Sequence, residues 1–364
     1  METGTLQHVF DRPGPFVTAY LDTSGDAEDA AKAIELRWRA IRERLQQQGA
    51  DEATVQAIAD HVREHRAQTG QRGQVLVGEG AEVVLQDELP EPPTDLPTED
   101  QAYVGPVPHL MPYLRRCVTR VAFLAADVDH TGADLMVVPR SGEVKRVRID
   151  GESHPVHKTH AGEQENQQRF HMAVEERWKR NAEAVAGEIT ERAGKMGAQA
   201  IALTGEDQQR SLVRSLLGED QELVIEPASR QESAERLRYE VTRSVHDAEV
   251  AEVVEEFQRE SGRGERAVEG WQDTLGAVRQ GQVRTLLWTA DDHAGDLHVG
   301  AGPTELAADE RALKDTGSDI IGDAPASAAV VRALAGTGAD LVITEPGTID
   351  LTGGIGAVLR YPAA

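Results

Sequence analysis

A long helical pattern between Gln167 and Met196 constrains the fold of this chain more than any other feature. Its apolar residues recur three and four positions apart: Phe170, Val174, Trp178, Ala182, Val185 and Ile189. This spacing places them along one face of an α-helix, so that face must pack against another element. Charged residues, including Arg169, Arg177 and Arg180, are expected on the roughly opposite, solvated side. The pattern therefore predicts a helix packed along a sheet.

Shorter patterns around this helix predict the rest of a central domain, residues 116–229. Three strands precede the helix, and Gly132 and Ser141-Gly142 separate them as turns. Three strands followed by helix, strand, helix and strand is the element order of a ribonuclease-H-like α/β layer. The predicted elements besides the long helix are the strands 121–127, 133–138, 143–149, 200–203 and 223–225 and the helix 208–217.

The preceding residues, 1–115, predict an α/β domain of their own. Its elements are a strand at 16–21, helices at 28–48 and 51–69, and strands at 74–77 and 82–85 that form a hairpin across Gly78-Glu-Gly80. A proline-rich, acidic stretch from Glu88 to Pro112 follows. We interpret it as an extended connector that leaves the domain.

The residues after the central domain, 230–364, alternate between helix and strand. The pattern predicts helices at 232–260, 268–280 and 325–334, strands at 283–288 and 341–343, and a turn at Gly353 into a terminal strand. This alternation is typical of an α/β/α sandwich. Trp271 and Trp288 are expected in its core or at a domain interface.

Composition bounds the environment of the chain. The 364 residues carry a net charge of -25, which opposes non-specific binding to nucleic acid but permits a local basic surface. The single cysteine excludes an internal disulfide and fits a reducing cytoplasm. No apolar run is long enough to span a bilayer, and no secretory leader is visible, so we expect a cytoplasmic protein without a membrane partner.

A histidine-rich loop, residues 151–166, leads into the long helix. His154, His157, Lys158 and His160 lie within seven residues of one another. A zinc site would need further ligands, and only Glu152 and Glu163 are near, so we expect no metal and no cofactor. A nucleophile–base pair has no better support, since twelve histidines offer accidental partners. Contact with folded RNA is the third interpretation, because cationic and aromatic side chains suit phosphates and unstacked bases.

The order of the three segments, and this loop and helix above all, resembles the archaeo-eukaryotic peptide-chain release factor superfamily, which includes Pelota. The resemblance covers about Arg120 to Tyr361, and Leu275-Gly-Ala-Val278 and Gly281-Gln-Val-Arg284 look like parts of the family's third domain. It implies a central domain whose loop enters the ribosomal peptidyl-transferase centre. It also implies a ribosomal-protein-like C-terminal module that binds a translational GTPase such as EF-Tu. The first domain looks like the divergent N-terminal domains of bacterial members and would face the decoding region of the small subunit.

The chain departs from this family at the catalytic tip. The family's Gly-Gly-Gln is absent, and the nearest match in the loop is Gly162-Glu163-Gln164. Glycine permits backbone conformations that other residues resist, and a glutamate would place negative charge beside a carbonyl that becomes negative during hydrolysis. The departure predicts a factor that is not an enzyme. It resembles Pelota and the Balon-like ribosome hibernation factors in lacking the tripeptide.

We therefore predict a monomeric hibernation factor that occupies the A site and peptidyl-transferase centre of the 70S ribosome without hydrolysing peptidyl-tRNA. Two alternatives remain: a ribosome-rescue peptidyl-tRNA hydrolase, and a non-ribosomal α/β protein that binds a protein partner. The residues expected to contact 23S ribosomal RNA are His157, Lys158, His160, Gly162, Gln164, Arg169, Arg177, Lys179 and Arg180.

Overall fold

The structure is a computed structural model, and its contacts divide the chain into two compact units. Unit 1 comprises Met1–Cys117 and Glu249–Ala364, and unit 2 comprises Val118–Ala248. The predicted first and third domains thus fall within one unit, and the division into three domains stays a prediction. The residues that the structure describes are 3–25, 30–64, 72–117, 121–140, 144–151, 164–217, 223–225, 234–289 and 295–362.

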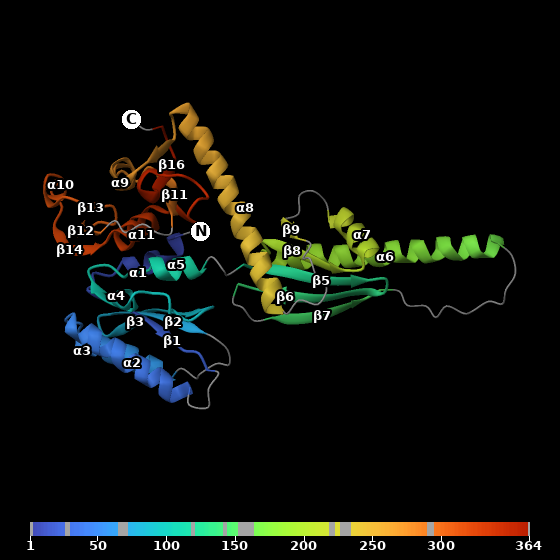
Figure 1. The fold of residues 1–364 in the computed structure, drawn as a ribbon, viewed down its shortest axis with the longest axis horizontal. Coiled ribbons are helices and arrows are strands. Elements are labelled where there is room, and N and C mark those ends of the chain that lie inside the picture. The colour runs from blue at the N-terminus through green and yellow to red at the C-terminus, as the bar shows by residue number, and fades with distance from the viewer. Residues whose placement is uncertain are drawn as a thin grey trace. The chain divides into compact units, whose positions relative to one another are not determined.

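Unit 2 is built on a five-stranded sheet with the strand order β7-β6-β5-β8-β9 (Figure 1). The first three strands are antiparallel neighbours, whereas β8 and β9 run parallel to β5. This is the predicted order of elements, and the α/β class is confirmed. The strands are β5 (Phe123–Asp129), β6 (Gly132–Val138), β7 (Lys145–Asp150), β8 (Ala200–Gly205) and β9 (Leu223–Ile225), and the helices are α6 (Gln164–Met196), α7 (Asp207–Leu217) and the first half of α8 (Ala234–Arg263).

The alternation of side chains along β5 explains why helices cover both faces of this sheet. Leu124 and Ala126 share a core with Ile189 of α6. Phe123 points to the opposite face and shares a second core with Val241 of α8. Successive side chains of a strand point to opposite faces, so the apolar run from Phe123 to Ala126 requires cover on both sides.

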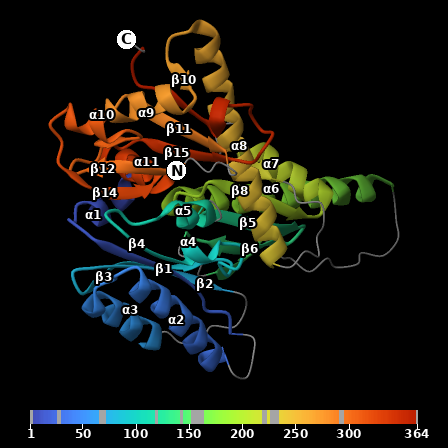
Figure 2. The ribbon, with the colours of Figure 1, turned by 60° about the vertical axis from the view of Figure 1, so that its left-hand side comes forward.

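The N-terminal part of unit 1 is an antiparallel sheet with the order β3-β2-β1-β4. Helices α2 and α3 lie side by side against one of its faces in both Figure 1 and Figure 2, and Ile34 and Trp38 of α2 share a core with Leu76 of β2. The elements are β1 (Phe16–Asp22), α2 (Ala30–Gln47), α3 (Glu52–Glu64), β2 (Gly73–Glu79), β3 (Glu82–Leu89) and β4 (Ala102–Gly105), preceded by the short helices η1 (Thr3–Leu6) and α1 (Gln7–Phe10). The hairpin turn lies at Gly80-Ala81, one step later than predicted.

The expected extended connector, Glu88 to Pro112, is wrong as a description of this stretch. It contains α4 (Thr98–Gln101) and β4, which pairs with β1 and becomes the fourth strand of the sheet. Val107 and Leu110 are buried, and α5 (Met111–Cys117) follows. The prolines and acidic residues obscured these apolar positions, which alternate over too few residues to form a recognisable strand pattern.

The C-terminal part of unit 1 contains a sheet with the order β10-β16-β11-β15. Phe257 of α8 packs against Leu287 and Val358 on one face, while α9 and α11 contribute to the core on the other. The elements are β10 (Ala267–Glu269), α9 (Trp271–Arg279), β11 (Val283–Thr289), α11 (Ala326–Thr337), β15 (Asp340–Thr344), η2 (Thr352–Gly354) and β16 (Ile355–Leu359). The predicted turn at Gly353 is confirmed, but the predicted helix at 268–280 begins only at Trp271, because Val268 belongs to β10.

A second sheet in this part, with the order β13-β12-β14, was not predicted. Glycine and aspartate residues occur within its strands β12 and β14. These strands therefore lack the apolar pattern that identifies strands in a sequence. The elements are β12 (Asp296–Gly300), β13 (Leu306–Ala307), α10 (Glu310–Lys314) and β14 (Ile320–Pro325).

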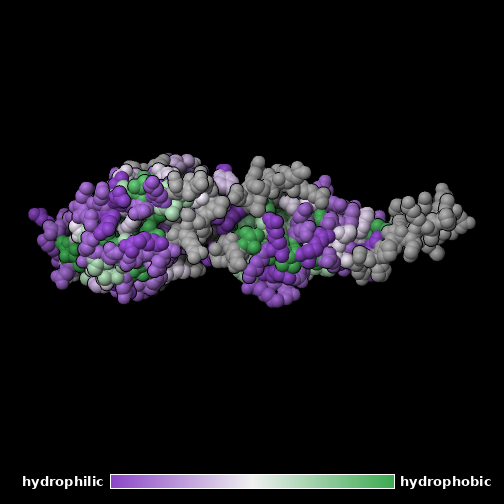
Figure 3. Space-filling view, turned by 90° about the horizontal axis from the view of Figure 1, so that it is seen from below, coloured by the Kyte–Doolittle hydropathy of each residue, from purple (hydrophilic) through white to green (hydrophobic). Residues whose placement is uncertain are grey.

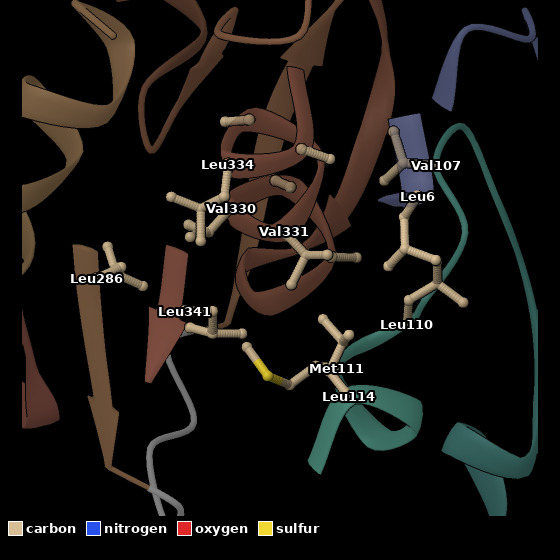
Figure 4. Close-up of a cluster of buried hydrophobic side chains, with 14 of the residues drawn as sticks. Leu6, Val107, Leu110, Met111, Leu114, Leu286, Val330, Val331, Leu334 and Leu341 are labelled. Carbon is tan, nitrogen blue, oxygen red and sulfur yellow. The ribbon is translucent and has the colours of Figure 1, made fainter. Parts of the chain in front are cut away.

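One core joins the two ends of the chain within unit 1. Leu6 and Leu110 from the N-terminal part and Val331 and Leu341 from the C-terminal part belong to it, and Figure 4 shows these side chains gathered around α11. Trp288 is 1 % exposed and lies edge-on to Trp271, as expected of core tryptophans.

One face of the molecule is shown in Figure 3, coloured by hydropathy. In the face shown in Figure 3, hydrophobic areas are small and interrupted. Within the described ranges, no helix has the length and apolar character needed to cross a membrane.

Candidate functional site

Helix α6 packs on the sheet of unit 2 through its second half. Among the described α6 side chains, from Val174 onward, those that reach the core include Ala182, Val185 and Ile189. This confirms the predicted apolar face over these positions. In Figure 1 the first turns of α6 extend past the end of the sheet.

The loop leaves the sheet at a tightly fitted point, Gly151, directly after β7. The Gly151 backbone N–H donates to the Thr131 carbonyl oxygen at 2.6 Å. A Cβ atom at Gly151 would lie 2.4 Å from the Asn181 Cγ atom. Asn181 in turn donates from its Nδ2 to the His130 carbonyl oxygen at 2.9 Å. Hydrogen bonds and close packing therefore connect Gly151, the β5–β6 turn and the middle of α6.

His130 makes most of the contacts that connect these elements. Its ring stacks on the Trp178 ring with 4.0 Å between centroids and 14° between planes. The His130 Nε2 atom lies 2.6 Å from Glu206, and the Gln209 side chain lies 3.1 Å from Nδ1. We call His130, Trp178, Asn181, Glu206 and Gln209 the anchor cluster. It connects α6 with the β5–β6 turn and with the start of α7.

A second network stiffens the same turn from the sheet side. Arg148 of β7 lies 3.2 Å from Asp129 and 3.1 Å from Asp134. Burial alone would raise the pKa of Asp129, but hydrogen bonds from Thr131 and Arg148 outweigh it and lower that pKa below its usual value. These charges therefore serve to hold the turn in place.

The structure describes only part of the predicted contact surface. His157, Lys158, His160 and Gly162 lie outside the described residues. Gln164 and Arg169 lie in the first turns of α6, where only the backbone is described. Of the other predicted contacts, Lys179 and Arg180 are exposed and Arg177 is half-buried.

Arg177 departs from its predicted position. It was expected opposite the apolar face, but its partial burial places it at the edge of that face, one turn before Asn181. Helical geometry explains this, since Arg177 precedes Trp178 by one residue and follows Val174 by three.

The anchor cluster was not predicted from the sequence, apart from Trp178 as part of the apolar face. Its members come from three separate segments, and no spacing links His130 to Glu206 or Gln209. Among the residues that the structure describes, no group of three or more His, Cys, Asp or Glu side chains could hold a metal. The loop histidines lie outside the described residues.

Comparison with known proteins shows what this region resembles. Residues 122–263 match the model of the bacterial archaeo-eukaryotic release factor family 2, from β5 to the end of α8. The whole chain is 29% identical to the protein Rv2629 of Mycobacterium tuberculosis H37Rv over 375 aligned positions, covering 100% of this chain and 98% of the relative.

Two solved structures show a weaker likeness. Archaeoglobus fulgidus Pelota matches with a TM-score of 0.37 and 14% identity, covering 80% of this chain and 79% of its own. Saccharomyces cerevisiae Dom34, a translation termination-like factor, matches with a TM-score of 0.39 and 11% identity, covering 75% and 76%. The family match rests on the region that contains the loop, α6 and the anchor cluster. Over residues 122–263 the chain is thus similar to the bacterial archaeo-eukaryotic release factor family 2.

Proposed function

We propose that this protein is a ribosome hibernation factor that occupies the A site and the peptidyl-transferase centre without hydrolysing peptidyl-tRNA. The observation that carries the proposal is the release-factor family match over residues 122–263, in a chain whose loop reads Gly162-Glu163-Gln164. The family match supports a ribosomal site for the loop, and the altered tip supports binding without hydrolysis. The protein would act in the cytoplasm, where ribosomes are.

The anchoring of α6 supports this function. A loop that enters a deep binding site must be attached to a rigid element. Helix α6 meets this need, because its second half and the anchor cluster hold it on the sheet while its first turns extend past the sheet. The contacts around His130 hold both the helix and Gly151, from which the loop departs, so the support of the loop is already in place before binding.

The distribution of charge supports an RNA-facing role for unit 2. Unit 2 contains 18 of the 38 basic and 23 of the 63 acidic residues, which gives it a net charge of -5. The remaining 20 basic and 40 acidic residues give unit 1 a net charge of -20. Electrostatic repulsion from phosphates is therefore concentrated in unit 1, and Arg177, Lys179 and Arg180 lie in the unit that repels RNA least.

The sequence of the tip supports binding without hydrolysis. The carboxylate of Glu163 would repel the negative charge that develops on the ester carbonyl oxygen. Its side chain would also disfavour backbone conformations that a glycine at this position permits. The C-terminal part of unit 1 is the proposed contact for a GTPase of the EF-Tu class, which would deliver the factor.

Co-sedimentation with 70S ribosomes tests the proposed surface. The triple substitution Arg177→Glu, Lys179→Glu and Arg180→Glu should reduce the bound fraction strongly, because each reversal replaces attraction to phosphate with repulsion. The matched control reverses Arg140, Lys145 and Arg146, which are exposed in the same unit but lie outside α6. It makes the same change in net charge and should leave most binding intact. Equal loss in both variants would contradict a surface centred on α6.

A peptide-release assay separates the proposal from the hydrolase alternative. Saturating protein should bind ribosomes that carry labelled peptidyl-tRNA and leave the peptide attached. Release of the peptide, abolished by Gln164→Ala, would instead identify a hydrolase that uses the Gly162-Glu163-Gln164 tip.

A further inference from the structure

A cavity of about 220 Å³ lies in the N-terminal part of unit 1, the unit that does not contain the loop or α6. One wall is the stripe of α2 that carries Arg37, Ala40, Ile41 and Arg44, at the helical spacing of three and four. The end of β1 forms the floor, and the segment around Pro93 and Gln101 closes the other side. The cavity is therefore lined by parts of the chain that are far apart in sequence.

The charges on these walls are unequal. Arg37 pairs with Asp22 at 3.1 Å and also donates to the Asp22 carbonyl oxygen at 3.1 Å. Asp22 is further engaged by the Ser24 backbone N–H at 2.9 Å. Arg44 is half-buried, and its guanidinium makes no ion pair or side-chain hydrogen bond with any residue that the structure describes. Within the described part of the chain, one positive charge thus has no acidic partner at the cavity.

An unpaired, half-buried arginine is unexpected in this chain. Acidic residues outnumber basic ones by 63 to 38, so partners are plentiful. Partial burial of a guanidinium without a partner costs free energy, because its five donors lose water without gaining other acceptors. Neighbouring arginines on the same helix, such as Arg39 and Arg42, do contact acidic side chains, Glu35 and Glu52. Arg44 differs from them in facing the cavity.

We propose that this cavity binds a small organic oxyanion, a carboxylate or a phosphate carried on a compact apolar body. The planar guanidinium of Arg44 presents the paired donors that match either oxyanion. Leu21, Ala40, Ile41 and Pro93 supply apolar walls for the body of the ligand. Binding here would give unit 1 a small-molecule ligand that is independent of any ribosomal contact of α6.

Isothermal titration of the full-length protein with four probes tests the site. Benzoate and phenyl phosphate combine an oxyanion with an apolar body, benzyl alcohol lacks the charge, and inorganic phosphate lacks the body. We expect benzoate or phenyl phosphate to bind, with the tighter of the two identifying the oxyanion, and the other two probes to bind at least about tenfold more weakly.

The matched variants are Arg44→Met and Arg39→Met, which remove one charge each from the same helix. Arg44→Met should weaken binding about tenfold or more, whereas Arg39→Met should leave it within about twofold. Circular dichroism melting of both variants checks that the fold persists. Absence of binding by both aromatic anions, equal binding of benzyl alcohol, or equal effects of the two substitutions would each overturn the proposal.

Discussion

His130 connects three elements through one side chain, and no single contact that it makes is strong. Its ring is held by stacking on Trp178, by Glu206 and by Gln209, while its backbone carbonyl accepts from Asn181. Each such contact contributes on the order of 1 kcal/mol, so the precision of the anchor comes from their number.

Two glycine substitutions test how tightly the loop departs from the sheet. In Gly151→Ala the new methyl group collides with Asn181, which must move and lose its bond to His130, so we expect a destabilisation of roughly 1–3 kcal/mol. In Gly187→Ala on α6 the methyl group meets open space, and the helix should gain about 0.5–1 kcal/mol. Urea unfolding measures both, and similar effects of the two variants would contradict the fitted contact.

His109 predicts a pH dependence of stability in unit 1. Burial, reinforced by the charge of Arg115, lowers the pKa of His109 from 6.5 to about 4, even though Asp100 lies 3.6 Å from its Nδ1 atom. Between these values the unfolded chain binds a proton that the folded chain excludes, so stability should fall as the pH drops from about 6.5 to about 4. The full loss from this group is roughly 3 kcal/mol.

The control for this pH effect is His109→Gln, which keeps a polar side chain near Ser327 and cannot titrate. The free energy of unfolding, measured by urea at pH 7.5 and pH 4.5, should fall less in the variant than in the natural protein. An identical fall in both would show that His109 does not contribute.

At the scale of elements, the second half of α6 holds the helix on the sheet. Ile189 is fully buried against the β5 and β8 side chains, whereas Leu216 of α7 is 38% exposed. Ile189→Ala should cost about 2–5 kcal/mol through lost burial and the cavity left behind, and Leu216→Ala should cost within about 0.5 kcal/mol. Thermal unfolding followed by circular dichroism compares the two, and equal shifts in Tm would contradict this assignment of the packed face.

Regular, apolar elements were predictable from the sequence, and irregular ones were not. The period of α6 and the apolar runs of β5, β6 and β8 persist over enough residues to identify these elements. Strand β4 and helix α5 lie among prolines, and β12 and β14 lie among glycines and aspartates, so burial by tertiary contacts determines them. The composition of the loop was visible in sequence, but the anchor cluster required the fold to bring distant residues together.

At the scale of the whole molecule, the division of charge between the units predicts how binding responds to salt. If α6 contacts ribosomal phosphates, the dissociation constant should rise steeply with salt concentration. Replacing Arg177, Lys179 and Arg180 with glutamine should reduce the slope of log Kd against log salt by about three, one for each lost phosphate contact. An unchanged slope would place the RNA contacts elsewhere.

The proposed function requires the protein to take the place of a tRNA in the A site and to leave the P-site peptide intact. Filter binding of labelled aminoacyl-tRNA to 70S ribosomes that hold peptidyl-tRNA in the P site measures this directly. Increasing amounts of the protein should exclude the A-site tRNA at one molecule per ribosome while the peptidyl-tRNA ester persists. Undiminished A-site tRNA binding at saturating protein would contradict the account.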